Sequence, residues 1–166
     1  SIHWAYQPVS LPTLPSTSIF DIFKKKEGNE IDLFIDEKLR SVGLKRNPEA
    51  DKRSLLRRVS LDLIGMPAPA HLQSAFLKDA SSNAYESLVD SLLSLPAYGE
   101  RWTAMWMDLS RYADSKGYER DYIRSIWRYR DWLINAFNQD KPYNQFITEQ
   151  LAGDLLPDPT DEQFLA

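Results

Sequence analysis

The stretch from Tyr98 to Asp131 constrains the fold most, because it combines aromatic rings with paired charges at helical spacing. Four of the five Trp residues lie between positions 102 and 132. At 100° per residue, a helix here has one broad apolar face, which carries Tyr98, Trp102, Met105, Trp106, Leu109, Tyr112 and Ala113. Arg101, Asp108 and Arg111 form a charged stripe along the border of that face, and the last two have i,i+3 spacing.

A loop from Asp114 to Arg124 and a second helix, residues 125–140, are expected to follow. One interpretation is a helical hairpin core with salt bridges at its rim. The other is an aromatic-walled, charge-lined pocket at the loop. The hairpin is favoured, because structural ion-pair networks resemble functional sites at this level. The candidate residues for the cleft or ion-pair cluster are Asp108, Arg111, Asp114, Glu119, Arg128, Arg130, Asp131, Glu149 and Asp154.

Arg130 lies in the middle of an apolar stripe on the second helix. A guanidinium keeps its charge, so burying it without a partner would be very costly. We therefore expect a carboxylate beside it, either Asp108 or Asp114, with Glu149 or Asp154 as alternatives. In the functional interpretation, Arg130 points with Arg111 and Arg128 into a cleft for an anion, such as a haem propionate or an acidic sugar.

Amphipathic helices account for most of the remaining chain. The expected segments are Glu30 to Val42 with a stop at Gly43, a helix capped by Asn47 and ending at Gly65, Pro69 to about Leu77, a helix opened by a capping box at Asn83, Tyr143 to Leu151, and the terminal residues 161–166. We find no convincing period-2 alternation and no hairpin turn between strand-like runs. The predicted class is all-α, an irregular multi-helix bundle.

The first 18 residues are rich in Pro and are predicted to form an extended N-terminal strap, which Trp4 and Tyr6 could dock in a strand-like way. Residues 19–166 are predicted to form one helical domain, since 166 residues is the size of a single domain.

Composition excludes several classes of function. A net charge of −4 and a pI near 5.2 disfavour a nucleic-acid partner. The absence of Cys excludes disulfides, thiolate zinc sites, Fe–S clusters and thioether-linked haem within this chain. His3 and His71 are far apart in sequence, so a zinc site is not expected and no cofactor is assigned. No apolar run approaches the 18 residues of a membrane span, and no signal peptide is visible.

Five motifs then occur in order: HWAYQPV, IDLFIDEKL, EADKRSLLRRVSLDLIGMP, YGERWTAMWMDLSRYADSKGYERD and WRYRDWLINAFNQDKPYNQFITEQLAGDLLP. Together they resemble the second of the planctomycete-type cytochrome-associated domains, catalogued as domain of unknown function number fifteen forty-nine. The resemblance implies a bacterial, exported protein in the periplasm or outside the cell, in which the domain often follows a c-type cytochrome domain. The family's haem-attachment motif lies beyond Ala166, so the chain resembles a domain truncated before it, with c-type haem expected downstream. One departure is Met105, which stands where the family usually has His.

The resemblance carries no established reaction, and whether the chain is an enzyme stays open. The first hypothesis is a non-catalytic helical module of a multidomain cytochrome c-like protein, serving electron transfer or assembly, with the protein's other domains or a redox partner as its partners. The alternative is an extracellular glycan-binding or glycan-processing module, because carboxylates lie near aromatic side chains in the central stretch.

Overall fold

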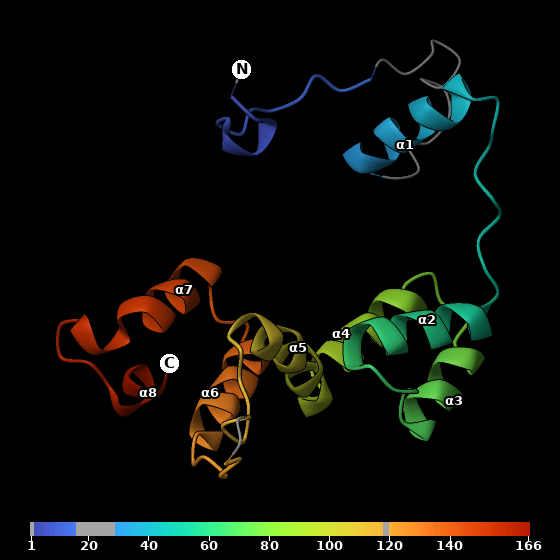
Figure 1. The fold of residues 1–166 in the computed structure, drawn as a ribbon. Helices are drawn as coiled ribbons and strands as arrows, with labels where there is room; N and C mark the ends of the chain where they lie inside the picture. The colour runs from blue at the N-terminus through green and yellow to red at the C-terminus, as the bar shows by residue number, and fades with distance from the viewer. Residues whose placement is uncertain (1, 16–28, 118–119) are drawn as a thin grey trace. The chain divides into compact units, whose positions relative to one another are not determined.

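The computed structural model describes residues 2–15, 29–117 and 120–166. The chain divides into two compact units, Ser1–Glu49 and Ala50–Ala166, and each is described by itself. Across the described residues there are eight α-helices, two short 3-10 helices and one isolated β-bridge, and no strand (Figure 1). The all-α class is therefore confirmed.

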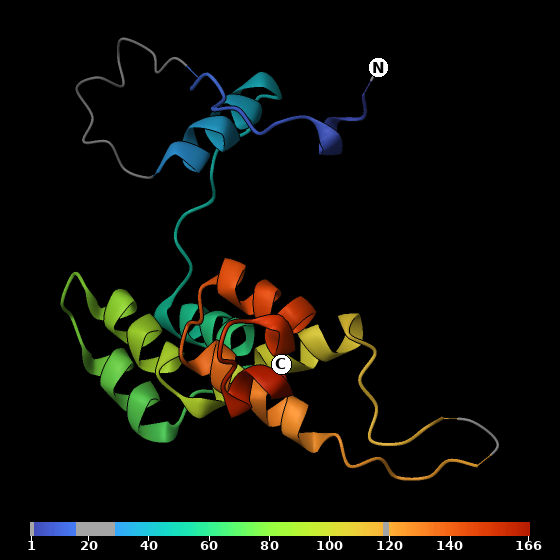
Figure 2. The same ribbon diagram turned by 90° about the vertical axis from the view of Figure 1, so that its left-hand side faces the viewer.

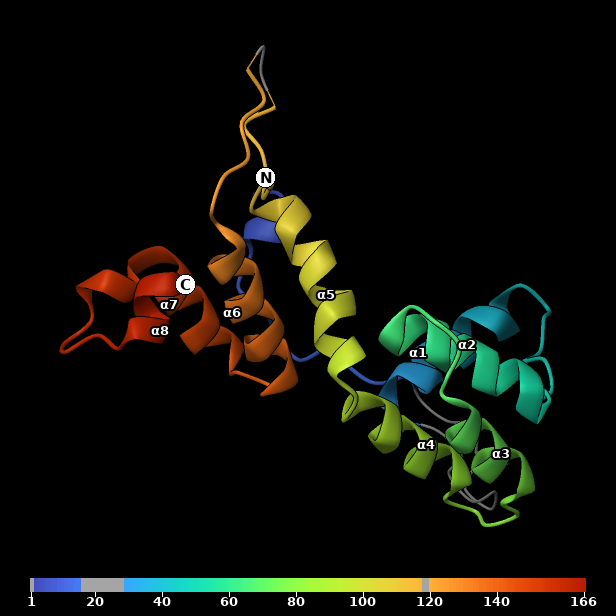
Figure 3. The same ribbon diagram turned by 90° about the horizontal axis from the view of Figure 1, so that it is seen from below.

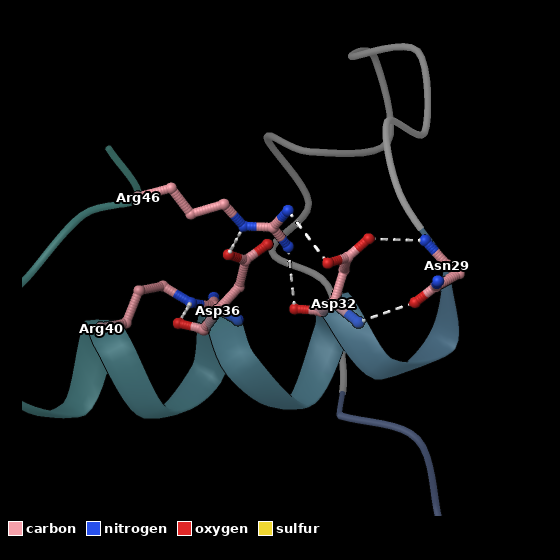
Figure 4. A network of polar contacts seen from close by, with 5 residues as sticks. All are labelled: Asn29, Asp32, Asp36, Arg40 and Arg46. Carbon is pink, nitrogen blue, oxygen red and sulfur yellow. Dashed lines mark hydrogen bonds and ion pairs between the residues drawn. The ribbon is translucent and has the colours of Figure 1, made fainter. Parts of the chain in front are cut away.

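Helix α1, Glu30–Ser41, is the α-helix of the first unit among the described residues. Its first turn is held by a capping box, in which the Asn29 amide oxygen accepts from the Asp32 backbone N–H at 3.1 Å and the Asp32 carboxylate accepts from the Asn29 N–H at 2.8 Å (Figure 4). Its last turn ends at Gly43 with φ +71°, and the Leu44 N–H donates to the Leu39 carbonyl at 2.9 Å. This is the Schellman ending that Gly43 and an apolar follower predict.

The segment after α1 turns back along the helix, because Arg46 binds two acids one turn apart. Its guanidinium contacts the Asp36 carboxylate at 2.5 Å and the Asp32 carboxylate at 3.1 Å (Figure 4). The hydrogen bond to Asp36 is the main reason that the pKa of Arg46 is raised. These contacts are local and lie on the helix surface.

The N-terminal segment was predicted to be extended, with Trp4 and Tyr6 in a strand-like arrangement. In the structure, Trp4–Tyr6 forms a 3-10 helix instead. The side chain of His3 caps this turn by accepting from the Ala5 N–H. Residues 7–15 carry no helix or strand, and the side chains of residues 2–14 are exposed.

The second unit begins with three helices around one core: α2 (Lys52–Ile64), α3 (Ala70–Lys78) and α4 (Ala84–Leu93). The core members are Leu56, Val59, Ile64, Ala68, Phe76, Ala84, Leu88 and Leu92. Helix α2 starts four residues later than predicted, because the Asp51 carboxylate, and not Asn47, accepts from the N–H groups of the first turn. The capping box predicted at Asn83 is also wrong, since its backbone is not extended and its side chain accepts no bond from the helix.

Helices α5 (Pro96–Leu109) and α6 (Trp127–Asn138) pack along each other (Figure 3). The approach is close at Gly99, where an added Cβ would lie 2.5 Å from the Ile134 carbonyl oxygen. The Asn138 amide holds the first turn of α5, because its oxygen accepts from the Gly99 N–H at 2.9 Å and its nitrogen donates to the Pro96 carbonyl at 3.3 Å.

The broad apolar face predicted for α5 is only partly buried. The buried residues of α5 are Gly99 and Thr103, which do not belong to that face. Trp102 and Trp106 of the face are half-buried, and its Met105 and Leu109 are exposed. Small residues make the closest helix–helix contact, so the large rings lie at its edges.

Helix α5 ends at Leu109, and Arg111 adopts a left-handed conformation with φ 54°. Asp108 and Arg111 are not paired in the described part of the chain, because their i,i+3 spacing aligns two side chains only while the helix continues. The Tyr112 N–H donates instead to the Met107 carbonyl at 2.9 Å, which closes a Schellman turn.

An arm, residues 112–117 and 120–126, connects α5 to α6 and runs away from both (Figure 2). Its two sides pair through a bridge between Ser115 and Ile123. The Arg124 N–H donates to the Asp114 carbonyl at 2.7 Å, and the Lys116 N–H donates to the Tyr122 carbonyl at 3.2 Å. The predicted loop thus contains antiparallel pairing that the sequence pattern did not indicate.

Helix α7 (Tyr143–Ala152), a 3-10 turn (Gly153–Leu155) and helix α8 (Asp161–Leu165) complete the unit. They form a second core with α6, made of Trp132, Leu133, Ala136 and Phe146. Thr160 and Gln163 form a capping box that begins α8. None of the helices among the described residues is long and apolar enough to cross a bilayer.

Candidate functional site

A groove of about 730 Å³ lies between α6 and α8. Its α6 side consists of positions spaced at i, i+3, i+4, i+7, i+8 and i+11, which share one face of a helix. Its lining residues are Trp127, Arg128, Asp131, Trp132, Asn135, Ala136, Gln139, Lys141, Asp161, Glu162, Phe164 and Leu165.

Helix α8 is brought to the groove by contacts with the end of α7. Gly153 has no side chain, and an added Cβ there would collide with the Gln163 carbonyl oxygen. The Gln163 amide nitrogen donates to the Glu149 carboxylate at 3.3 Å. Leu165 packs against the core that contains Trp132. These contacts fix the second wall of the groove.

Behind the groove, Lys141 and Glu149 form a buried ion pair with an Nζ to Oε2 distance of 2.5 Å. Gln145 adds a second bond to the carboxylate at 2.8 Å. Burial raises the pKa of Glu149, but hydrogen bonds from Lys141, Gln145 and Gln163 outweigh it, so the pKa lies below its ordinary value. Lys141 also lies 5.1 Å from the centre of the Trp132 ring.

Two aromatic side chains of the groove reach solvent. Trp127 is 46% exposed and Phe164 is 60% exposed, whereas Trp132 is buried. The Arg128 guanidinium lies 5.6 Å from the centre of the Trp127 ring. Each of the two Trp rings therefore already has a cation of the protein beside it.

A second polar cluster lies at the base of the arm. The Tyr112 hydroxyl donates to the Asp114 carboxylate at 2.7 Å, and Arg130 contacts Asp114 at 4.0 Å and Asp131 at 3.3 Å. The bond to Asp114, followed by burial, raises the pKa of Tyr112. Asp114 is thus one of the two partners first predicted for Arg130, while the contact with its neighbour Asp131 was not predicted.

A third set of polar contacts joins three helices through Gln150 of α7. Its amide oxygen accepts from the Trp106 indole N–H at 3.2 Å and from the Tyr129 hydroxyl at 2.7 Å. Tyr129 stacks on Tyr112 with ring centres 6.3 Å apart. The base of the arm is therefore linked to the aromatic core.

The residues predicted for one cluster are distributed over several places. Arg128 and Asp131 line the groove, Asp114, Arg130 and Asp131 form the cluster at the arm, and Glu149 pairs with Lys141 and not with Arg130. Asp108, Arg111 and Asp154 are exposed and take no part in the ion pairs of the described residues. Glu119 lies outside the described residues.

The groove contains residues that the sequence reasoning missed, namely Lys141, Asn135, Gln139, Phe164, Asp161 and Glu162. The helical spacing of Asn135 and Gln139 with Arg128 and Asp131 was a usable signal. Nothing in the sequence placed α8 opposite α6. Within the described parts of the chain, no three His, Cys, Asp or Glu side chains are grouped to hold a metal ion.

The model of the family described as PSCyt2, protein of unknown function (DUF1549), matches residues 30–166. No curated protein and no solved structure matches the chain. The matched range contains both the arm and the groove.

Proposed function

Because the chain belongs to the PSCyt2 family of unknown function, we propose that it is a non-catalytic helical module of an exported, multidomain cytochrome c-like protein. In this proposal the protein acts in the periplasm or outside the cell, and the module serves electron transfer or assembly. The haem belongs to another part of the polypeptide, because c-type attachment requires Cys and this chain has none.

The arm is the observation that carries this proposal. Ile123 is 89% exposed, Tyr122 is also exposed, and both lie on the side of the arm that pairs with residues 115–116. Hydrogen bonds from the Ser115 hydroxyl and the Gly117 N–H lower the pKa of Asp121 and hold that side of the arm in place. Neighbouring exposed apolar side chains on a hydrogen-bonded projection are available to bind another protein domain.

The test uses the complete protein and this chain by itself. We expect the complete protein in the periplasmic or secreted fraction, with the absorption spectrum of c-type haem. We expect this chain to bind the separately purified remainder of the protein in calorimetry, and Ile123→Asp to weaken that binding at least tenfold. Leu151→Asp is the control, because Leu151 is also largely exposed, at 81%, but lies on α7. A cytoplasmic protein without haem, or binding that Ile123→Asp leaves unchanged, would contradict the proposal.

Glycan binding is a second candidate function, and the groove between α6 and α8 favours it. A volume of about 730 Å³ lies within the range of roughly 300–1,000 Å³ that is usual for small-molecule sites. Exposed aromatic rings and several polar side chains line it together. This function is independent of the arm, so the two candidates can be tested separately.

A further inference from the structure

We propose that the groove between α6 and α8 binds a neutral oligosaccharide. This proposal rests on the second candidate function and specifies its ligand. It is carried by three properties of the groove: its aromatic walls, its charge balance and the row of polar side chains on α6.

The aromatic walls suit a ligand that has an apolar face. Trp127 and Phe164 expose about half or more of their surface, and the buried Trp132 also belongs to the lining. A pyranose ring presents axial C–H groups on one side, and covering an aromatic ring with them removes apolar surface from water. Its hydroxyl groups remain at the edge of the ring, where polar side chains can reach them.

The charges of the groove disfavour an ionic ligand. Its lining holds Arg128 and Lys141 against Asp131, Asp161 and Glu162. Lys141 is already compensated by Glu149, and Asp131 by Arg130. An added cation would meet Arg128 and Lys141 beside the two Trp rings, and an added anion would meet the acids of α8.

Haem is also a poor fit for this groove. None of the described residues that line it is His, Cys or Met, the side chains that most often ligate haem iron. The two acids of α8 would repel haem propionates, which disfavours a haem propionate as the ligand of this groove.

Planar hydrogen-bonding side chains run along α6 at positions 128, 131, 135 and 139. At 1.5 Å per residue this row is about 16 Å long, which suits a short oligosaccharide better than one sugar ring. Guanidinium, carboxylate and amide groups each offer two adjacent polar atoms, and neighbouring sugar hydroxyls match that geometry.

The experiment measures binding of this chain to soluble neutral β-glucan, xylan, mannan and α-glucan oligosaccharides, with oligogalacturonate as an acidic comparison. Binding is followed by calorimetry and by Trp fluorescence. We expect at least one neutral series to bind, with an affinity that changes less than twofold between about 0.05 and 0.5 M salt, because no net charge is involved.

Variants locate the site. Trp127→Ala and Asn135→Ala should each weaken binding at least tenfold, and thermal unfolding should show that both variants are folded. Trp4→Ala is the matched control, because Trp4 is exposed and lies outside the groove. The proposal is overturned if no neutral series binds at millimolar concentration, if oligogalacturonate binds better, or if Trp127→Ala and Trp4→Ala have equal effects. Those failures would leave the arm and its Ile123→Asp test untouched.

Discussion

Glu149 illustrates how one side chain organises its surroundings. Glu149 is only 3% exposed, and its carboxylate accepts bonds from Lys141, which precedes α7, from Gln145 of α7 and from Gln163 of α8. Removing one partner of a buried ion pair lowers stability strongly, because the remaining buried charge then has no partner. Glu149 therefore links the position of α8 to that of α7.

We expect Glu149→Gln to lower the free energy of unfolding by about 3 kcal/mol, because Lys141 would keep its charge in a mostly buried place. Denaturant unfolding of both proteins at pH 7 measures the difference. Asp154→Asn, an exposed acid close by in sequence, should change stability by less than about 0.5 kcal/mol. Equal effects of the two substitutions would show that the pair has no special role.

Lowering the pH should also remove the stabilising contribution of Glu149, because its carboxylate becomes protonated. The pKa of Glu149 is lower in the folded state than its ordinary value of 4.5, so the unfolded chain takes up the proton more readily. The stabilising contribution is therefore complete above about pH 4.5 and is lost as the pH falls through the lowered value. We expect the unfolding free energy of the wild type to fall more steeply below pH 4.5 than that of Glu149→Gln. Parallel curves for the two proteins would exclude this residue as the cause.

Two substitutions of Trp106 can separate what the packing of its ring contributes to stability from what its hydrogen bond contributes. Its ring meets Phe146 edge-on at 4.8 Å, and its indole N–H donates to Gln150. We expect Trp106→Ala to cost about 3 kcal/mol, near the lower end for truncating a buried aromatic side chain, because the ring is half-buried. Trp106→Phe should cost about 1 kcal/mol, the usual value of one hydrogen bond. Chemical denaturation monitors both, and a loss below about 1 kcal/mol for the Ala variant would show that the ring packs weakly.

At the scale of elements, the ends of the helices decide how well the sequence predicts the fold. Gly43 predicts the end of α1, and the structure confirms this prediction. The ends of α5 and α6 use Arg111 and Asp140 in the left-handed conformation, so no glycine marks them. Asn138, at the end of α6, bonds the first turn of α5, and local sequence does not contain such a tertiary contact.

The candidate site follows the same rule. Arg128 and Asp131 were predicted because they lie on the aromatic, charged helix itself. Lys141 and the α8 residues were missed, since they reach the groove through the Glu149 network and through the contact at Gly153. Periodicity identifies the face of a helix, but not which later segment covers that face.

The end of α5 gives a test at this scale. A non-glycine residue in the left-handed region costs roughly 1–2 kcal/mol, and glycine avoids this cost at some loss of chain entropy. We expect Arg111→Gly to raise the unfolding free energy by about 0.5–1 kcal/mol. Ser110→Gly should lower it, because Ser110 has an ordinary helical backbone with φ −79°. Thermal unfolding compares the two, and destabilisation by both would show that Arg111 makes a contact worth more than its backbone strain.

At the scale of the whole molecule, the chemistry of the chain limits what it can carry. It contains no Cys and only two His residues, His3 and His71, which belong to different units. We expect the purified chain to be colourless after expression in cells that mature c-type cytochromes. An absorption spectrum from 350 to 700 nm provides the measurement. A Soret band that survives dialysis would contradict this expectation.

The arm also determines where a protease should first cleave the chain. Lys116, Arg120 and Arg124 are exposed on it, and exposed loops are preferred sites of proteolysis, so brief trypsin treatment should nick the chain there first. The packing of Gly99 on Ile134 and the bonds of Asn138 and Gln150 do not depend on that peptide connection. The two fragments should therefore remain one particle in gel filtration and separate only in detergent, so that the gene could be expressed as two complementing halves.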